Sequence, residues 1–264
     1  MNPRVPTFLR SVTWLECGVV ASAATLLFLF PRRGGQEVWA WVTPPFNARY
    51  VGTIYLGALV PLLALAARGR WFPGRLVLWM ILVFTTAIMV VMLASPGRFE
   101  WERPATWVFW ALYLFLPVNS VVYLWRLRDL PAGERRGARP ALVALGLLLG
   151  LYGLALLVAP ERATEFWPWS VDAFHARIYA ATFLTPAVGA WLIHDRGGGA
   201  EDRTLGATLV VFAVAAVLGV LVTDASVPAA ARVDYGDAGT WAFFALNVGP
   251  GLAGAVLLAR PRTP

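Results

Sequence analysis

Long apolar runs separated by short polar segments dominate the pattern of this chain. An α-helix needs about 20 mainly apolar residues to cross the ~30 Å hydrocarbon core of a membrane. Backbone groups in lipid must also be satisfied within the segment, which favours helices over open strands. The pattern therefore predicts eight membrane-spanning helices, at residues 12–30, 50–67, 76–94, 106–125, 141–159, 176–194, 204–223 and 240–259.

The sequence matches itself at a separation of 128 residues. Six residues between positions 37 and 49 are identical to those found 128 positions later: Glu37, Trp39, Trp41, Phe46, Ala48 and Arg49 correspond to Glu165, Trp167, Trp169, Phe174, Ala176 and Arg177. Further along, at a separation of 134, Thr106 and Trp107 correspond to Thr240 and Trp241. This self-similarity predicts two tandem four-helix repeats, residues 1–130 and 140–264, joined by a cytoplasmic basic linker at 131–139.

The distribution of arginine predicts the orientation of the chain. Of the 22 arginines, 14 lie at the two ends and in every second loop, and 8 lie in the alternate loops. The positive-inside rule therefore places both termini in the cytoplasm, in a multi-pass protein of the inner (plasma) membrane. Four spans return the chain to its starting side, so the repeats are expected to be parallel and related by an axis along the membrane normal. The first apolar run is interpreted as a span and not as a cleaved signal peptide, since it has a counterpart in the second repeat.

Composition excludes several classes of protein. The chain is 59% hydrophobic and 14% charged, whereas soluble domains have about 45–50% and 25%. Its single cysteine rules out an internal disulfide, and the absence of lysine rules out Schiff-base chemistry. The net charge of +7 is spread over turns between spans, so nucleic acid is not an expected partner. No hydrolase, ATPase or redox motif is present, so we expect a non-enzymatic protein without cofactor or metal.

Prolines occur inside the even-numbered predicted spans, at Pro61, Pro117, Pro186 and Pro250. Each removes a backbone donor and kinks or loosens its helix. Such backbone is tolerated in lipid where neighbouring groups satisfy it, which predicts that the even-numbered helices face the protein interior and line a cavity. The alternative is that proline is simply commoner in membrane helices than in soluble ones.

The repeated segment E-x-W-x-W-x4-F-x-A-R is the candidate site, on the extracytoplasmic side. One interpretation is an aromatic belt at the lipid headgroups, formed by Trp39, Trp41, Trp167 and Trp169, with snorkelling arginines. The other is a pair of lids, in which Glu37 binds Arg49 and Glu165 binds Arg177, and the two arginines together hold a small anionic ligand.

Few other polar groups lie within the predicted spans. Asn119 and Asn247 lie near two of the kinks and are expected to bond between helices or to meet a solute. Glu16 is predicted about one turn inside the first helix, within reach of the cytoplasmic surface. His175 and His194 lie at opposite ends of one helix, about 28 Å apart, so they cannot share one metal or haem. Glu161, Glu165, Asp172 and His175 could form a metal site, but a solvated loop is favoured at these residues.

The second outer segment carries one further likeness. Its residues 166–169, Phe-Trp-Pro-Trp, and 174–177, Phe-His-Ala-Arg, resemble a W-P-W-x-L-T-P-L-T-A-R signature of uncharacterised multi-pass proteins of high-GC bacteria. The residues between, 170–173, depart from that signature. The resemblance implies location in a membrane and no particular activity.

These patterns predict an all-α membrane protein that binds or passes a small solute or lipid-like molecule between its two repeats. Beyond the lipid bilayer, its expected partners are that small anionic or lipid-like ligand and other membrane proteins. One alternative is an accessory or scaffold subunit of a larger membrane complex, which predicts a solid bundle without a cavity. A second is an intramembrane lipid-modifying enzyme, which requires polar residues that converge at one depth.

Overall fold

The computed structural model describes residues 2–135 and 137–260, and about 79% of the chain is helical. Within that part, eight helices are long and apolar enough to cross a membrane, which confirms the prediction of an all-α, multi-pass membrane protein. They are α1 (Thr7–Leu29), α3 (Pro45–Arg68), α4 (Trp71–Ala94), α5 (Pro104–Arg126), α6 (Pro140–Val158), α8 (Ala173–Ile193), α9 (Gly199–Ser226) and α10 (Ala238–Ala259).

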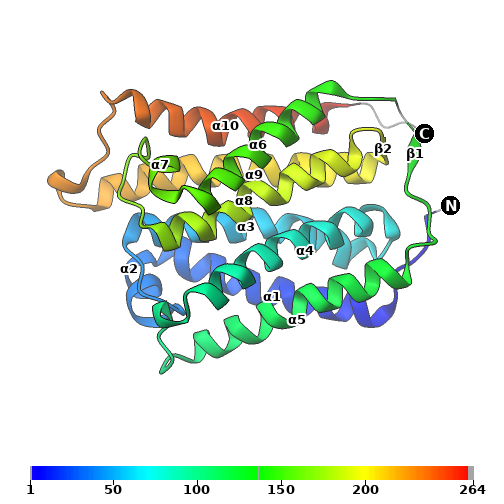
Figure 1. The fold of residues 1–264 in the computed structure, drawn as a ribbon, viewed down its shortest axis with the longest axis horizontal. Coiled ribbons are helices and arrows are strands. Elements are labelled where there is room, and N and C mark those ends of the chain that lie inside the picture. Colours follow the sequence, from blue (N-terminus) through cyan, green and yellow to red (C-terminus); the bar gives the residue numbers. More distant parts are fainter. Residues whose placement is uncertain (1, 136, 261–264) are drawn as a thin grey trace.

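Short elements connect the spans. A small antiparallel pair joins two loops, with β1 (Glu134–Arg135) against β2 (Arg196–Gly197). The remaining short elements are helical: α2 (Pro31–Arg33), the π-helix η1 (Gly34–Val38), η2 (Pro96–Arg98), α7 (Pro160–Ala163) and η3 (Ala229–Ala231). The first and last described residues, 2 and 260, lie at one end of the bundle, the terminal end, and α2 and α7 lie at the opposite, distal end (Figure 1).

Helix boundaries follow from local chemistry. Proline occupies the first helical position of α3, α5 and α6, where its missing amide hydrogen costs nothing. Asp172 caps α8 by accepting the His175 amide, and Asp237 caps α10 by accepting the Gly239 amide. At the end of α3, Gly69 adopts the left-handed conformation (φ 54°) and its amide donates to Leu65.

Four helices form the inner layer of the bundle and four form its outside. We call residues 2–126 the first half and 140–260 the second half. Between the halves, α3 packs on α9 and α4 packs on α8. Outside them, α1 packs on α3, α5 on α4, α6 on α8 and α10 on α9 (Figure 1). Exchanging the two halves therefore leaves this pattern of packing unchanged.

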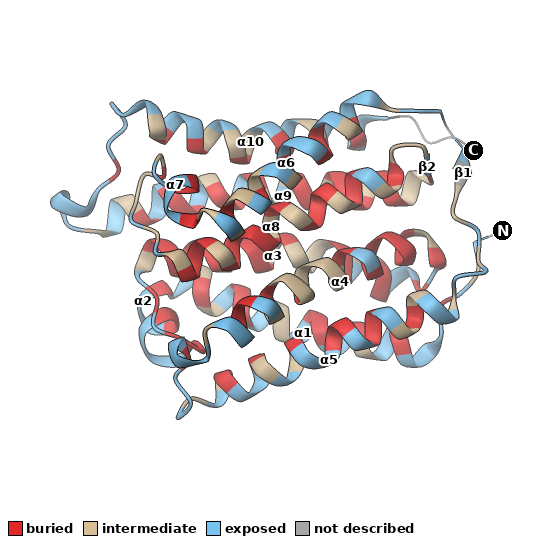
Figure 2. Cartoon of the chain, viewed as in Figure 1, coloured by how far each residue is buried: buried red, intermediate tan, exposed pale blue. Residues whose placement is uncertain are grey.

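Burial follows the same division. In the most apolar part of the inner helices α3 and α8, 61% and 67% of residues are buried, against 33% in each of α1, α6 and α10. Figure 2 shows the buried residues concentrated along the inner helices. The outer helices carry large exposed apolar side chains, such as Leu15, Leu151 and Leu252, as surfaces in contact with lipid do.

The inner helices differ from those predicted from the prolines. Of the helices with an interior proline, α3 and α8 are inner helices but α5 and α10 are peripheral. The other inner places belong to α9, which has no proline, and to α4, whose proline lies in its first turn. Pro117 and Pro250 are nevertheless buried. A proline needs protein contacts only on its own face of the helix, so it does not require the whole helix to be interior.

Two ion pairs lie near the terminal end. Arg75 of the first half is 3.0 Å from Glu201 of the second half, and the Glu201 side chain is fully buried. Arg139, the residue directly before α6, binds both carboxylate oxygens of Asp202 of the second half, at 2.9 and 3.0 Å. The Arg75–Glu201 pair thus joins the two halves by a charged contact that is shielded from solvent.

Candidate functional site

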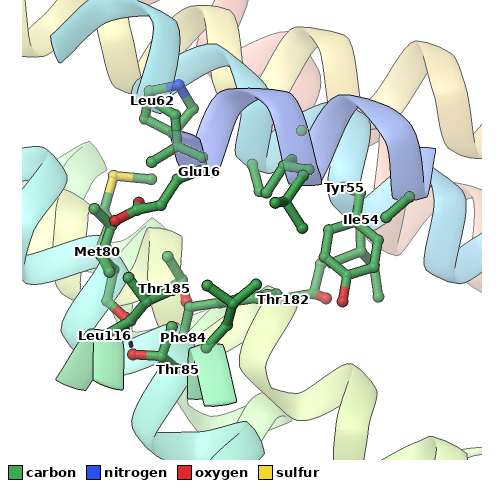
Figure 3. Close-up of a pocket in the computed structure, with 18 of the residues that line it drawn as sticks. Glu16, Ile54, Tyr55, Leu62, Met80, Phe84, Thr85, Leu116, Thr182 and Thr185 are labelled. Carbon is green, nitrogen blue, oxygen red and sulfur yellow. Dashed lines mark hydrogen bonds between the residues drawn. The ribbon is translucent and has the colours of Figure 1, made fainter. Parts of the chain in front are cut away.

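A cavity of about 310 Å³ lies inside the first half. Helices α1, α3, α4 and α5 form most of its wall, and α8 and α9 of the second half supply the rest (Figure 3). Pro61 and Pro186 line the cavity, whereas Pro117 and Pro250 are not among its lining residues. The cavity therefore belongs mainly to one half and is not centred between the two.

Apolar and aromatic side chains dominate the cavity wall. Six aromatic rings line it: Trp39, Tyr55, Phe84, Phe109, Tyr113 and Phe212. The hydroxyl groups of Tyr55 and Tyr113 bond each other at 3.1 Å, and the Thr85 hydroxyl donates to the Ile81 carbonyl. These polar groups are satisfied within the protein, so the wall formed by them offers mostly apolar contact.

Glu16 is the charged residue among those that line this cavity, and it is only 4% exposed. It lies nine residues beyond the start of α1 at Thr7, which is about 13 Å along the helix axis. The expectation that it lies one turn inside the helix was wrong, because α1 begins five residues earlier than its apolar run. In Figure 3 Glu16 is one of the side chains that surround the open space.

Several polar atoms at the cavity lack partners within the described part of the chain. The Glu16 carboxylate forms no hydrogen bond or ion pair there. The Thr182 and Thr185 hydroxyls and the Trp39 indole nitrogen are buried without a hydrogen-bond partner. All of these residues line the cavity. Buried polar groups are nearly always satisfied, and three of the seven unsatisfied buried side-chain atoms in the described residues line this one cavity.

At the distal end, a polar network joins the halves. The Trp41 indole of the first half donates to Nε2 of His175 at 3.1 Å, and the Thr43 hydroxyl bonds the same nitrogen at 2.9 Å. An indole nitrogen can only donate, so Nε2 accepts and Nδ1 carries the hydrogen of the neutral ring. Nδ1 then donates to Asp172 at 2.9 Å. Asp172 also pairs with Arg98 of the first half.

The opposite contact runs from the second half to the first. The Trp169 indole donates to the Asn47 side-chain oxygen at 2.9 Å, and the Tyr179 hydroxyl donates to the same oxygen at 2.8 Å. The Asn47 amide donates to the Ser170 carbonyl at 3.3 Å. Asn47 is 2% exposed, so it satisfies two buried donors of the other half in a site nearly closed to solvent.

These two contacts are reciprocal. At the separation of 128 residues, Trp41 corresponds to Trp169 and Asn47 corresponds to His175. Each tryptophan therefore donates to the counterpart of the other's acceptor. The rings repeat the exchange, because Trp41 packs on Phe174 with 5.4 Å between centroids and Trp169 packs on Phe46 with 5.3 Å. The sequence comparison did not single out Asn47 or His175 as partners, since the two differ in identity.

The aromatic-belt interpretation of the repeated tryptophans was wrong. Trp39, Trp41 and Trp167 are 7%, 1% and 6% exposed, and Trp169 is half-buried. The exposed tryptophans of the distal end include Trp107 and Trp241, which correspond at the separation of 134 and whose indoles donate to Trp101 and Tyr235 carbonyls at 3.0 Å. The four repeated tryptophans have bonding or packing partners in the protein that a headgroup layer would otherwise supply.

The expected Glu–Arg pairs are also absent from the described residues. Arg49 is buried and donates to the Phe28 carbonyl at 2.8 Å and to Thr223 at 2.6 Å. Arg177 donates to the Leu157 carbonyl at 3.3 Å, and Glu37 and Glu165 are exposed without such partners. Each arginine thus holds the end of the preceding long helix, where backbone carbonyls lack helical partners.

The two asparagines have different surroundings. Asn247 accepts from the Tyr50 hydroxyl at 3.1 Å and so bonds α10 to α3. Asn119 is buried on α5 and forms no such bond within the described residues. Neither lines the cavity. Across residues 2–135 and 137–260, no group of three His, Cys, Asp or Glu side chains is placed to hold a metal ion.

Comparisons of the chain with protein-family models, with curated proteins and with solved structures find no match.

Replacing Asn47 tests the distal network. Asn47→Leu leaves the Trp169 and Tyr179 donors buried without an acceptor, and each such loss costs about 1–3 kcal/mol. We expect the free energy of unfolding in detergent to fall by about 2–4 kcal/mol. Asn119→Leu makes the same chemical change without breaking a bond and should cost less than about 1 kcal/mol. Equal effects of the two substitutions would contradict the assigned role of Asn47.

Asp172 predicts an acid dependence of stability. Partial burial alone would raise its pKa, but hydrogen bonds from the His175 ring and amide, with the charge of Arg98, hold the pKa well below its usual range. The unfolded pKa is about 3.9, so the stabilisation is present above that pH and is lost as pH falls toward the lower folded pKa. Wild type should therefore lose more stability than Asp172→Ala between about pH 4 and pH 2.

Chemical unfolding across that pH range measures the difference. At neutral pH, Asp172→Ala should cost about 1–2 kcal/mol through loss of the helix cap. Asp237→Ala, which removes the equivalent cap of α10, controls for capping alone. Parallel acid profiles for wild type and Asp172→Ala would show that the carboxylate does not stabilise the fold by its charge.

Proposed function

We propose that this membrane protein binds a small apolar or lipid-like molecule in the cavity of its first half. The observation that carries the proposal is a cavity of about 310 Å³ walled by aromatic and aliphatic side chains. Ligand cavities range over about 300–1,000 Å³ and are mostly apolar with a few polar groups that orient the ligand. The cavity meets both descriptions.

The site differs in place from the one that the sequence predicts. The repeats were expected to hold a ligand between them, but the cavity has most of its wall from α1, α3, α4 and α5. Residues of α8 and α9 close one side, including Thr182, Pro186 and Phe212. A shift of α8 and α9 against the first half would change access to the cavity. Passage of the ligand would require two such arrangements.

The proposal includes a duplicated origin of the two halves. Identities at the separation of 128 residues and the reciprocal Trp41–His175 and Trp169–Asn47 contacts support it. A contact made twice with its partners exchanged is what a twofold axis between equivalent units produces. Since each unit has four spans, that axis would run along the membrane normal.

The proposal also places both termini in the cytoplasm and the protein in the plasma membrane. The excess of arginine at the terminal end supports this orientation. The single cysteine, Cys17, is buried and should react little with thiol reagents. Labelling of a cysteine introduced into the β1 loop can therefore be measured without interference from Cys17. In intact cells, a membrane-impermeant thiol reagent should leave that cysteine unlabelled, and labelling would reverse the orientation.

The role supported best is binding without catalysis. An accessory subunit is expected to have a solid bundle, so the cavity favours a binding role. An intramembrane enzyme would need reactive groups that converge on one point. The ionisable and hydroxyl groups at the cavity wall include Glu16, tyrosines and threonines. No group of three His, Cys, Asp or Glu that could hold a metal ion occurs in the described part of the chain.

Filling the cavity tests the proposal. Ala58 of α3 lines the cavity, so Ala58→Phe should occupy part of the space, whereas Ala67→Phe places the same ring at an exposed position of α3. With 4-phenylbutanol as the probe, wild type and Ala67→Phe should show saturable thermal stabilisation in detergent. At ten times the dissociation constant this amounts to about 1.4 kcal/mol. Ala58→Phe should show little. Equal stabilisation of all three would place binding outside the cavity.

A further inference from the structure

We propose that the ligand of this cavity is an organic cation, an apolar molecule with a protonated amine, and that Glu16 is its anionic partner. This inference rests on the proposed function and specifies the class of ligand. It commits the site to positive charge, in contrast to the anion that the arginine-rich outer segments suggested.

Glu16 occupies a position in which a carboxylate needs a partner. Its side chain lies about 13 Å along a membrane-spanning helix, is 4% exposed and lines the cavity. It has no hydrogen bond or ion pair within residues 2–135 and 137–260. An ionised carboxylate in an apolar site is strongly destabilised unless a charge or donors compensate it. A bound ammonium would provide both at once.

The sign of charge that the cavity wall can carry also favours a cation. No arginine or histidine is among the lining residues, so Glu16 is the lining residue that can carry a charge, and that charge is negative. An anionic ligand would meet repulsion there without a compensating donor cluster. Aromatic rings add to the preference for a cation, since their faces attract ammonium groups within about 6 Å. Trp39, Phe84 and Phe109 are among the six rings available.

Two unsatisfied hydroxyls lie in the wall of the same cavity. Thr182 and Thr185 lie three residues apart on α8 and therefore share one face of that helix. Both line the cavity, and both hydroxyls lack a hydrogen-bond partner. An ammonium has three donors, and one carboxylate does not use all of them. Neither hydroxyl oxygen exposes surface to the cavity as it stands, so each threonine side chain would have to rotate before its hydroxyl could accept from a bound ammonium.

The carboxylate is also specific to this half of the molecule. The residue 128 positions after Glu16 is Ala144, and the next is Leu145. The first helix of the second half, α6, therefore packs on its neighbours without an acidic residue at this position. The structural requirement of a four-helix unit does not explain why Glu16 is there, whereas a requirement of the ligand does.

A matched pair of probes tests the inference. 4-Phenylbutylamine is a cation at pH 7, and 4-phenylbutanol has the same carbon skeleton without charge. We expect wild type to bind the amine at least tenfold more tightly than the alcohol, by calorimetry in one detergent. Glu16→Gln keeps the shape of the side chain and should reduce that preference to less than threefold while it preserves alcohol binding. Glu37→Gln removes an exposed acid of the same half and should behave as wild type.

Each outcome distinguishes the inference from the proposed function. Equal binding of amine and alcohol by wild type, or a preference that survives Glu16→Gln, overturns the cationic ligand and leaves the cavity proposal standing. Binding of neither probe by folded wild type overturns both. If Glu16→Gln does not fold, Glu16→Asp keeps the charge but shortens the side chain by one methylene. It should weaken amine binding alone, and an unchanged amine affinity would overturn the inference.

Discussion

Inside hydrocarbon no water is available to a polar group, so it must find a partner in the protein or in a bound molecule. This constraint organises the bundle at both ends. At the distal end, Trp41 and Trp169 each donate to a side chain of the other half. At the terminal end, Arg75 reaches across to Glu201. In each case the partner comes from a distant part of the sequence, so satisfying these groups also fixes the two halves against each other.

The cavity is one place where that constraint is not met by the protein itself. Glu16, Thr182, Thr185 and Trp39 line it without partners in the described part of the chain. Single buried groups elsewhere also lack partners, such as the Trp110 indole nitrogen and the Ser120 hydroxyl, but they do not line the cavity. The gathering of several such groups around one open space, with an acid among them, is the physical basis for assigning a ligand to the cavity, since an unpaired charge within a membrane-spanning segment is costly.

The two halves share their packing but differ in what they enclose. Inner helices α3 and α8 are equivalent in position, yet Thr182 and Thr185 of α8 face a cavity whose opposite wall belongs to the first half. A duplication would account for this difference between the halves if one copy holds the ligand and the other completes the wall of the cavity. The reciprocal distal network then keeps the closing half in register with the binding half.

The eight spans were predictable from the sequence because length and apolarity decide whether a helix crosses lipid. The repeated outer segment was also identified, but not what its residues do. Trp41 finds His175, 134 positions away, and the acceptor in the other half is Asn47. The self-comparison of the sequence does not reveal this correspondence, because the two hydrogen-bond acceptors are an asparagine and a histidine. Glu16 was misplaced because polar residues near Thr7 hide the first turns of α1.

The cavity itself could not have been predicted. It depends on how six helices pack and on side-chain volumes at their contacts, neither of which the apolar pattern contains. Prolines gave a partial signal, since Pro61 and Pro186 line the cavity, but Pro117 and Pro250 carry the same sequence signal and lie elsewhere. Periodicity identifies which segments are helices, while the space between them is a property of the assembled bundle.

Native mass spectrometry of the protein extracted from its own membrane in mild detergent tests the central claim most directly. If the cavity holds a ligand, wild type should retain a small molecule of defined mass that dissociates on activation, and Ala58→Phe prepared in the same way should lack it. Bare chains of the expected mass in both preparations, or the same bound molecule in both, would contradict the account.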